Sequence, residues 1–371
     1  RQDSAPAGGD TVRERRYRPF IQPTFIHVLG NAVFALPVGE DDRPVRVRFD
    51  GVPADWRLAS DLEHGDLTVH RLMESVTVMG DFQVLMPRNG PAGLRVALRG
   101  NNWQFAAQDF VDRVGAIIAA QRAFWGSGEE RFLVTMLPFA PPQPGWVSMG
   151  GTGRGDGFAL FATTNSEGPR MTWLLAHESL HSWIPRRIGA MTEGANEPQD
   201  YWISEGFTDF YTDRRLVRAN QANGADFAYR LNEVLFEYAV SPVRAAPNAK
   251  VVTDFWKDGA TQKLPYQRGR LVAMLIDRAI FEKTNGTSDL DDVMLALQAQ
   301  ALSARGPQPI RQALSEATAR LGVAIAPILA RLIDAGEPAL LPTDVLAPCG
   351  TVQTITSAGA FHRGFDVERS I

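Results

Sequence analysis

The chain has 371 residues, of which 44% are hydrophobic and 22% are charged, and its formal net charge at pH 7 is −4. This composition is typical of a globular protein large enough for two or three domains, and the slightly acidic balance provides no basic field for nucleic acid. No run approaches eighteen uninterrupted apolar residues, so no membrane span is expected, and the single cysteine, Cys349, excludes an internal disulfide.

The pattern of the first hundred residues predicts a polar N-terminal segment followed by strands. Residues 1–17 are polar and contain Gly and Pro, so we expect them to be disordered. Residues 18–100 show short runs of apolar and polar alternation, as at 45–49 and 94–98, separated by Gly, Pro, Asp and Asn. This pattern predicts an N-terminal β domain over 18–100.

The middle of the chain predicts a small sheet followed by helices. A helix is expected over 105–125, and strands over 131–137, 146–149 and 158–162, with a glycine-rich turn at 150–157. Helical periodicity then covers 227–238, 266–283, 290–301, 310–321 and 325–335. We therefore predict an α+β protein in which a mainly helical domain spans 101–340, followed by a strand-like tail over 341–371.

The most informative stretch is His177-Glu178-Ser179-Leu180-His181, which reads H-E-x-x-H. It lies in a predicted helix over 170–184, a stretch without Gly or Pro. Positions i and i+4 share one helix face, so His177 and His181 can hold one metal ion, and Glu178 can act as general base. Because the chain has only six His, two ordinary surface histidines at this spacing are the less favoured alternative.

A third ligand is predicted at Glu205, in Trp202-Ile203-Ser204-Glu205-Gly206 at the start of a second helix. Two His and one Glu leave the fourth tetrahedral position open, which is the arrangement of catalytic zinc sites. Asp209 lies four residues further on the same face. It is our candidate to accept a hydrogen bond from a ligating imidazole, that of His177, with an ordinary solvated carboxylate as the equal alternative.

Two of these motifs, His177-Glu178-x-x-His181 and Trp202-x-Ser-Glu205-Gly-Phe, resemble those of the gluzincin metallopeptidases. The chain is most similar to the glycyl aminopeptidase family, whose members often carry a PDZ domain, and more distantly to the aminopeptidase N family. Further similar stretches are His181-Ser-Trp-x-x-x-Arg187-Ile, Leu264-Pro-Tyr-Gln-Arg-Gly269 and Ser288-Asp-Leu-Asp-Asp-Val-Met294.

The resemblance implies a thermolysin-like catalytic domain that holds one zinc ion on His177, His181 and Glu205, with Glu178 as the base. By motif position it makes Tyr266 the phenol that donates a hydrogen bond to the oxyanion. Without the resemblance, Tyr266 would be interpreted as a packed aromatic at a helix start. The predicted function is that of a zinc-dependent peptidase, an aminopeptidase by family, acting on peptides or proteins.

One stretch departs from the family. Related aminopeptidases anchor the substrate α-amine with a Glu, whereas Ser148-Met-Gly-Gly-Thr152 contains none. Gly150 and Gly151 are candidates for substrate contact, and Asp156 is the nearest acid in the sequence for the anchor. Two alternatives follow: a zinc endopeptidase or narrow-specificity peptidase without an amine anchor, and a catalytically weak peptide-binding module. Retention of Glu178 and Tyr266 argues against the module, since binding requires neither.

Location and assembly are inferred only indirectly. Similar proteins are often exported in bacteria, and the polar N-terminus fits a mature chain after signal removal, so a periplasmic or secreted location is expected, with the cytoplasm as the alternative. No sequence pattern specifies an oligomeric state.

Overall fold

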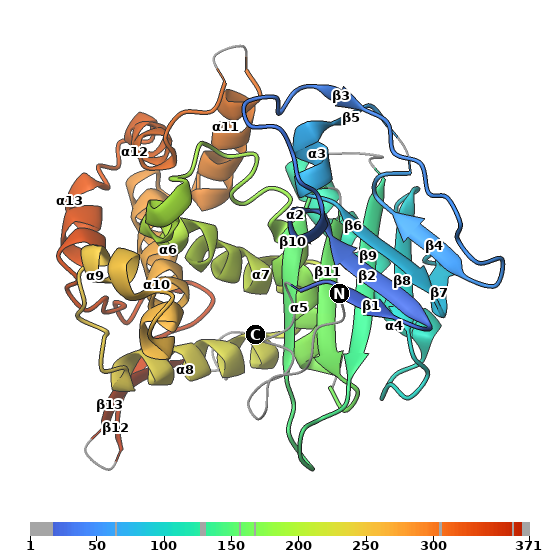
Figure 1. Cartoon of the computed structure of the whole chain (residues 1–371). Helices are drawn as coiled ribbons and strands as arrows, with labels where there is room; N and C mark the ends of the chain where they lie inside the picture. The colour runs from blue at the N-terminus through green and yellow to red at the C-terminus, as the bar shows by residue number, and fades with distance from the viewer. Residues whose placement is uncertain are drawn as a thin grey trace. The chain divides into compact units, whose positions relative to one another are not determined.

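The computed structural model describes residues 18–63, 65–126, 131–155, 157–166, 168–303, 306–357 and 360–365 (Figure 1). The predicted disordered segment 1–17 and the candidate Asp156 lie outside the described residues. The chain divides into two compact units, residues 1–182 and 183–371. The functional domains expected over 18–100 and 101–340 stay a prediction.

The first unit contains two main β-sheets. One is antiparallel, with strand order β1 (Phe20–Gln22), β2 (Phe25–Leu29), β6 (Val76–Gly80) and β4 (Arg57–Ser60). The other has the order β10 (Met149–Arg154), β11 (Gly157–Thr163), β9 (Phe132–Phe139), β8 (Leu94–Arg99) and β7 (Phe82–Leu85). In this sheet β9 runs parallel to both neighbours, whereas the two outer pairs are antiparallel.

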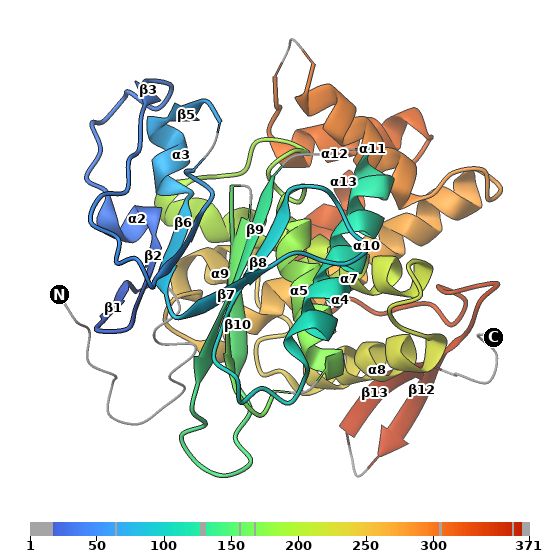
Figure 2. The ribbon, with the colours of Figure 1, turned by 90° about the vertical axis from the view of Figure 1, so that its right-hand side faces the viewer.

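Helices and a short strand pair complete the described part of the first unit. The strand pair is β3 (Pro44–Val45) with β5 (Leu67–Thr68), and the short helices are α2 (Gly30–Val33) and α3 (Val69–Met73). The long helices α4 (Ala107–Trp125) and α5 (Gly168–Leu180) pack against each other and against the five-stranded sheet, on its side away from β1, β2 and β6 (Figures 1 and 2). The strand pattern predicted over 45–49 was mostly wrong, because only Val45 of it pairs.

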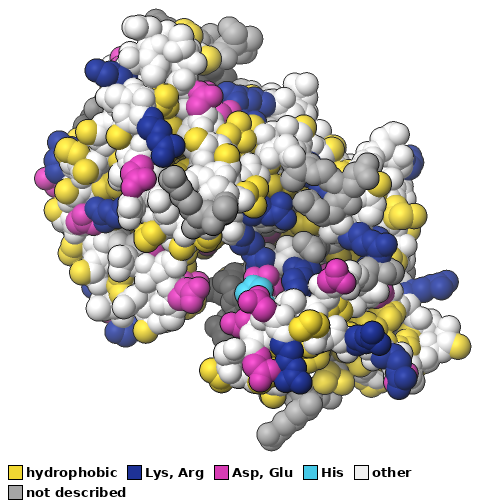
Figure 3. All heavy atoms as spheres, turned by 90° about the horizontal axis from the view of Figure 1, so that it is seen from above, with side chains coloured by type: hydrophobic (Ala, Val, Ile, Leu, Met, Phe, Trp, Pro, Cys, Tyr) yellow, Lys and Arg dark blue, Asp and Glu magenta, His cyan; other side chains and the backbone are white. Residues whose placement is uncertain are grey.

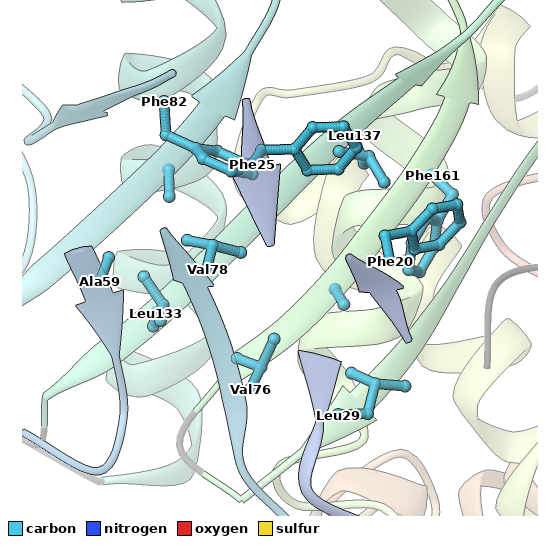
Figure 4. Close-up of a cluster of buried hydrophobic side chains, with 12 residues drawn as sticks. Phe20, Phe25, Leu29, Ala59, Val76, Val78, Phe82, Leu133, Leu137 and Phe161 are labelled. Carbon is cyan, nitrogen blue, oxygen red and sulfur yellow. The ribbon is translucent and has the colours of Figure 1, made fainter. Parts of the chain in front are cut away.

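The hydrophobic core of this unit lies between the two sheets (Figure 4). Alternate residues of each strand point to one face, so strands β2 and β6 contribute every second side chain. The core includes Phe20, Phe25, Leu29, Val76, Val78, Phe82, Leu133, Leu137 and Phe161. The rings of Phe20 and Phe161 lie on different sheets, with their centroids 6.2 Å apart. Their contact joins the two layers.

The glycine-rich segment 150–157 differs from its prediction as a turn. Residues up to Arg154 form strand β10, paired with β11 from Met149 opposite Ala162 to Arg154 opposite Gly157. Glycine is unfavourable in strands on its own, but here backbone pairing along the whole hairpin outweighs that preference. The sheet therefore ends in a long antiparallel hairpin rather than in two short strands around a wide turn.

The second unit is mainly helical. Its helices are α6 (Tyr201–Ser204), α7 (Gly206–Arg218), α8 (Gly224–Val240), α9 (Asn248–Asp254), α10 (Gly259–Lys283), α11 (Leu290–Ala301), α12 (Ile310–Arg320) and α13 (Ala326–Leu329). A 3₁₀ segment, Gly194–Asp200, precedes α6, and a π-helical turn, Ala330–Asp334, follows α13, so the helix predicted over 325–335 is split in two. The hairpin β12 (Val352–Ser357) and β13 (Ala360–Phe365) packs beside α8.

Helix α10 is the centre of this unit, since α6, α7, α8, α9 and α11 all contact it. Buried charges join it to α7. Asp213 on α7, 0% exposed, pairs with Arg270 on α10 and with Arg230 on α8, whose Nε lies 2.6 Å from its carboxylate. Arg214 binds Asp277 at 2.8 Å. Buried charges need such partners, so these pairs specify one packing of the helices.

The observed order of a β-rich first unit and a mainly helical second unit confirms the predicted α+β class. Among the described residues, no helix has the length and apolar character needed to cross a membrane.

Burial of His27 in the intersheet core makes the folded state sensitive to acid. Its Nε2 lies 3.1 Å from Thr135 Oγ1, and its ring contacts Phe20 and Phe161. Burial disfavours the charged imidazole and lowers the pKa of His27 from 6.5 to about 4.

We expect the free energy of unfolding to fall as the pH drops from about 6.5 toward 4, because only the unfolded chain binds this proton in that range. The loss has an upper limit of about 3 kcal/mol. Chemical denaturation at a series of pH values should show that the free energy of unfolding changes less with pH for His27→Gln than for wild type. His70→Gln, which changes an exposed imidazole, is the control. The same pH dependence of the unfolding free energy in all three proteins would show that His27 is not the source of the acid sensitivity.

Candidate metal centre

Helix α5 carries the H-E-x-x-H motif at its C-terminal end. It runs from Gly168 to Leu180, so it ends four residues before the predicted limit of Ile184, and His181 lies in the following turn. Pro185 has no N–H to donate to the His181 carbonyl, so the helix cannot continue through it. Instead, the Ser182 N–H donates to the Ser179 carbonyl at 3.2 Å, which tightens the chain at this point.

The two imidazoles still converge. His177 Nε2 and His181 Nε2 lie 3.1 Å apart, and the rings are nearly perpendicular, with an interplanar angle of 89°. One ligand atom from each of His177, His181 and Glu205 lies within 4.8 Å of the others. Zinc bonds of about 2.0–2.1 Å place tetrahedral ligands about 3.3 Å apart, so this donor set fits one zinc ion. The predicted ligand triad is confirmed as a group that can bind metal.

The first two residues of the motif are buried, and a neighbouring ring holds that of His177 in place. His177 is 5% exposed and Glu178 is 8% exposed. The Trp173 indole, one turn earlier on α5, stacks on the His177 ring with centroids 5.2 Å apart and an interplanar angle of 26°. Stacking of this kind restricts the rotamer of the imidazole before any metal binds.

Glycines of strand β10 let the sheet edge approach the motif closely. A Cβ on Gly151 would lie 2.7 Å from the Glu178 carboxylate, and one on Gly153 would lie 3.0 Å from His181 Cβ. Residues two apart on a strand share a face, so both glycines face α5. Gly151, predicted only as a substrate contact, thus also provides the space that the Glu178 carboxylate occupies, whereas Gly150 precedes it on the opposite face.

Two further glycines bring the Glu205 turn against α10. Glu205 joins α6 to α7, and its N–H donates to the Tyr201 carbonyl at 2.9 Å. A Cβ on Gly206 would lie 2.4 Å from Gly269 Cα, and one on Gly269 would lie 1.9 Å from the Trp202 carbonyl. No other residue type fits at this helix crossing, which places α7 at the part of α10 that carries Tyr266.

Tyr266 is the eighth residue of α10, about two turns from its beginning, and not at a helix start as expected. The helix begins earlier because Asp258 caps it, with its carboxylate accepting from the Thr261 N–H at 2.7 Å. Tyr266 is partly exposed. Its role toward an oxyanion stays a prediction.

Asp209 lies one turn beyond Glu205 on α7, where its N–H donates to the Glu205 carbonyl at 2.8 Å. It is only 6% exposed, so it is not an ordinary solvated carboxylate. The proposed hydrogen bond with the His177 imidazole stays a prediction.

Gln121 on α4 is a site residue that we did not predict. It is 1% exposed, its Nε2 donates to the Ala176 carbonyl at 2.9 Å, and its Oε1 accepts from Ser179 Oγ at 2.6 Å. It therefore holds the turn of α5 that carries His177 and Glu178. A signal was available, because Gln121 is a polar residue in the buried register of α4, seven residues after Val114 and four before Trp125.

Charged side chains of both signs are mixed on one face of the molecule. Figure 3 shows Lys, Arg, Asp and Glu side chains interspersed over the face in view, with hydrophobic side chains scattered between them. Such mixing produces no large field of one sign on this face.

Comparisons with known proteins agree with this geometry. In fold, the chain is similar to an aminopeptidase N family protein from Idiomarina loihiensis, with a TM-score of 0.73 and 14% identity over 91% of this chain and 63% of that chain. A variant of the M1 zinc metallopeptidase from Deinococcus radiodurans gives a TM-score of 0.50 and 15% identity over 86% and 71%. The chain thus spans less than two thirds of the first structure's length.

The chain thus shares the fold of an aminopeptidase N family protein, and His177, His181 and Glu205 form a group that can hold a metal ion. More specifically, residues 170–269 match the profile of the M61 glycyl aminopeptidase family, and this segment contains the motif helix, Glu205 and Tyr266. The resemblance predicted from the sequence is confirmed over these residues. Comparison with curated proteins gives no match.

We expect Gln121→Met to lower zinc affinity roughly tenfold, because partners that orient the ligands contribute on this scale. Arg113→Met is the matched control. Arg113 also bonds α4 to α5, through Thr172 Oγ1 at 2.9 Å, but near the opposite end of α5. Chelator competition should show reduced affinity only for Gln121→Met, although both variants lose stability. Equal zinc affinity in the two variants would show that Gln121 is merely structural.

Proposed function

We propose that this protein is a zinc-dependent peptidase that hydrolyses peptide bonds. The observation that carries the proposal is the convergence of His177, His181 and Glu205 within 4.8 Å, with Glu178 buried on the same helix turn, inside the segment that matches the glycyl aminopeptidase profile. A structural zinc site has four protein ligands, whereas this group offers three, which is the pattern of catalytic sites. The substrate class is therefore peptides or proteins.

The ligand set supports zinc as the metal. Imidazole nitrogen and a carboxylate oxygen suit zinc, and the nearly dry surroundings of His177 strengthen electrostatic interactions there. When bound, zinc supplies Lewis-acid chemistry, polarising a carbonyl group and lowering the pKa of a water toward about 7.

The chain's own residues provide the proton transfers. Glu178 follows a ligand directly, and Gly151 leaves room for its carboxylate. In the proposed mechanism, a Glu178 carboxylate oxygen takes a proton from the attacking water and passes it to the nitrogen of the leaving amine. The Tyr266 hydroxyl donates a hydrogen bond to the oxyanion that develops on the substrate carbonyl.

Glu178→Gln tests the general base. The amide has nearly the same shape but cannot accept the proton at neutral pH, so turnover should fall at least a hundredfold while zinc content stays at one per chain. His181→Ala should instead lose both zinc and activity. Metal analysis beside a peptide-turnover assay separates the two cases, and a fully active Glu178→Gln would remove Glu178 from the mechanism.

The finer proposal is aminopeptidase action. The similarity to aminopeptidase families supports it, but strand β10 has no acidic residue among Met149–Arg154, and its residues that face the motif are glycines. A bound α-ammonium group needs a carboxylate partner. We infer that Asp156 or an acid from another segment serves as the anchor. The second candidate, a peptidase that does not require a free amine, is favoured by the missing acid on β10.

One short peptide, tested with a free and with an acetylated N-terminus, distinguishes these candidates. An aminopeptidase should prefer the free amine by at least a hundredfold in kcat/KM, because the charged anchor stays unpaired with the acetylated peptide. Asp156→Asn should reduce that preference if Asp156 is the anchor. Equal rates for both peptides would exclude aminopeptidase action and leave the zinc peptidase proposal standing.

A further inference from the structure

Three aromatic rings form a cluster at the start of α6 and the end of α9. Tyr201 packs edge-on against Phe255 with centroids 4.6 Å apart, Phe255 against Trp256 at 4.9 Å, and Tyr201 lies 6.5 Å from Trp256. Phe255 is 6% exposed and forms the base of the cluster, whereas Trp256 is 65% exposed. The cluster therefore presents the Trp256 indole, supported from below, to solvent.

This aromatic ledge, defined here as Tyr201 and Trp256 on the base of Phe255, lies next to a metal ligand. The Glu205 N–H donates to the Tyr201 carbonyl at 2.9 Å, so the two residues are one helical turn apart. Side chains at i and i+4 share a helix face, with Cβ atoms about 5–6 Å apart. The Tyr201 ring thus leaves the helix on the same side as the carboxylate of Glu205.

We propose that the ledge is a subsite that binds an apolar, above all an aromatic, side chain of the peptide substrate close to the bond that is cleaved. The inference deepens the proposed peptidase function and rests on it. An exposed tryptophan alone is unremarkable in a protein surface, but one that is fixed by two other rings is a preorganised apolar contact. Covering it with a substrate ring removes apolar area from both partners and adds a favourable ring contact.

The charges around the ledge argue for a neutral side chain rather than an ammonium group. The carboxylates nearest in sequence already have partners. Asp254 binds Lys250 at 2.7 Å and Lys257 at 3.3 Å. Asp200 accepts a hydrogen bond from the Thr192 N–H at 2.8 Å, and Asp258 accepts one from the Thr261 N–H at 2.7 Å. None of the three is therefore a free anchor for a substrate amine. Recognition at the ledge depends on apolar area.

Another exposed aromatic residue, Tyr229, provides the matched control for substitutions in the ledge. Tyr229 on α8 is 67% exposed, nearly the same as Trp256, but it lies on a helix without a predicted metal ligand. Tyr229→Ala removes a comparable exposed ring without touching the ledge.

The test uses peptides that differ only by Gly or Phe at one position, with the position moved in turn along both sides of the cleaved bond. Wild type should prefer Phe at one position, and Trp256→Ala should lower kcat/KM for that Phe peptide at least tenfold while leaving its Gly partner within twofold. Trp256→Phe should retain most of the preference, and Tyr229→Ala should change neither peptide. Equal loss for the Phe and Gly peptides, or no loss in Trp256→Ala, would overturn the subsite.

A binding measurement keeps this test separate from the proposed function. Calorimetry on zinc-loaded Glu178→Gln, with and without Trp256→Ala, gives the affinity for the same Phe and Gly peptides without turnover. A Phe preference that requires Trp256 supports the subsite even if wild type cleaves neither peptide, in which case the peptidase proposal alone fails. If affinity for the Phe peptide is unchanged by Trp256→Ala at equal zinc content, the ledge is not a subsite.

Discussion

The constraint on which the site depends is that two imidazole nitrogens, one on a buried ring and one on a partly exposed ring, must lie about one tetrahedral edge apart. His177 and His181 meet it with a separation of 3.1 Å, although the regular helix ends between them. Burial of a polar ring such as that of His177 is costly unless its polar atoms have partners. Much of the first unit near α5 serves that end, from the Trp173 ring on His177 to the Gln121 bonds under the same turn.

At two places, glycines allow neighbouring elements to pack closer than any other residue would: β10 against α5, and α7 against α10. On β10, Gly151 and Gly153 let the edge strand of the sheet lie so close to the motif that a Cβ atom at either position would collide with it. On α7 and α10, Gly206 and Gly269 allow two helices to touch through backbone atoms beside Glu205. In each case the absence of a side chain determines where a candidate metal ligand or the Glu178 carboxylate can lie.

Polar contacts then select one arrangement among the apolar packings available. The Asp213 carboxylate with Arg270 and Arg230 fixes α7, α8 and α10 relative to one another. The packing that results also shapes the candidate substrate surface, since the turn that carries Glu205 also carries Tyr201, and α9 brings Phe255 and Trp256 against it. The candidate metal ligand Glu205 and the proposed substrate subsite therefore depend on the same helix contacts.

Sequence alone determined the ligand set, the α+β class and most of the long helices, because these follow from local periodicity and from spacing within one helix turn. His177, Glu178 and His181 are neighbours in sequence, so their convergence requires no knowledge of the rest of the chain. Only the tertiary structure decided three other features: the contact of Gln121 with α5, the burial of Asp209 and the pairing of β10 with β11. Each depends on which distant segment packs against it. The aromatic ledge is of the same kind: Tyr201 and Trp256 are 55 positions apart in the sequence, and their rings meet only because α9 packs on the 3₁₀ segment Gly194–Asp200, which directly precedes Tyr201.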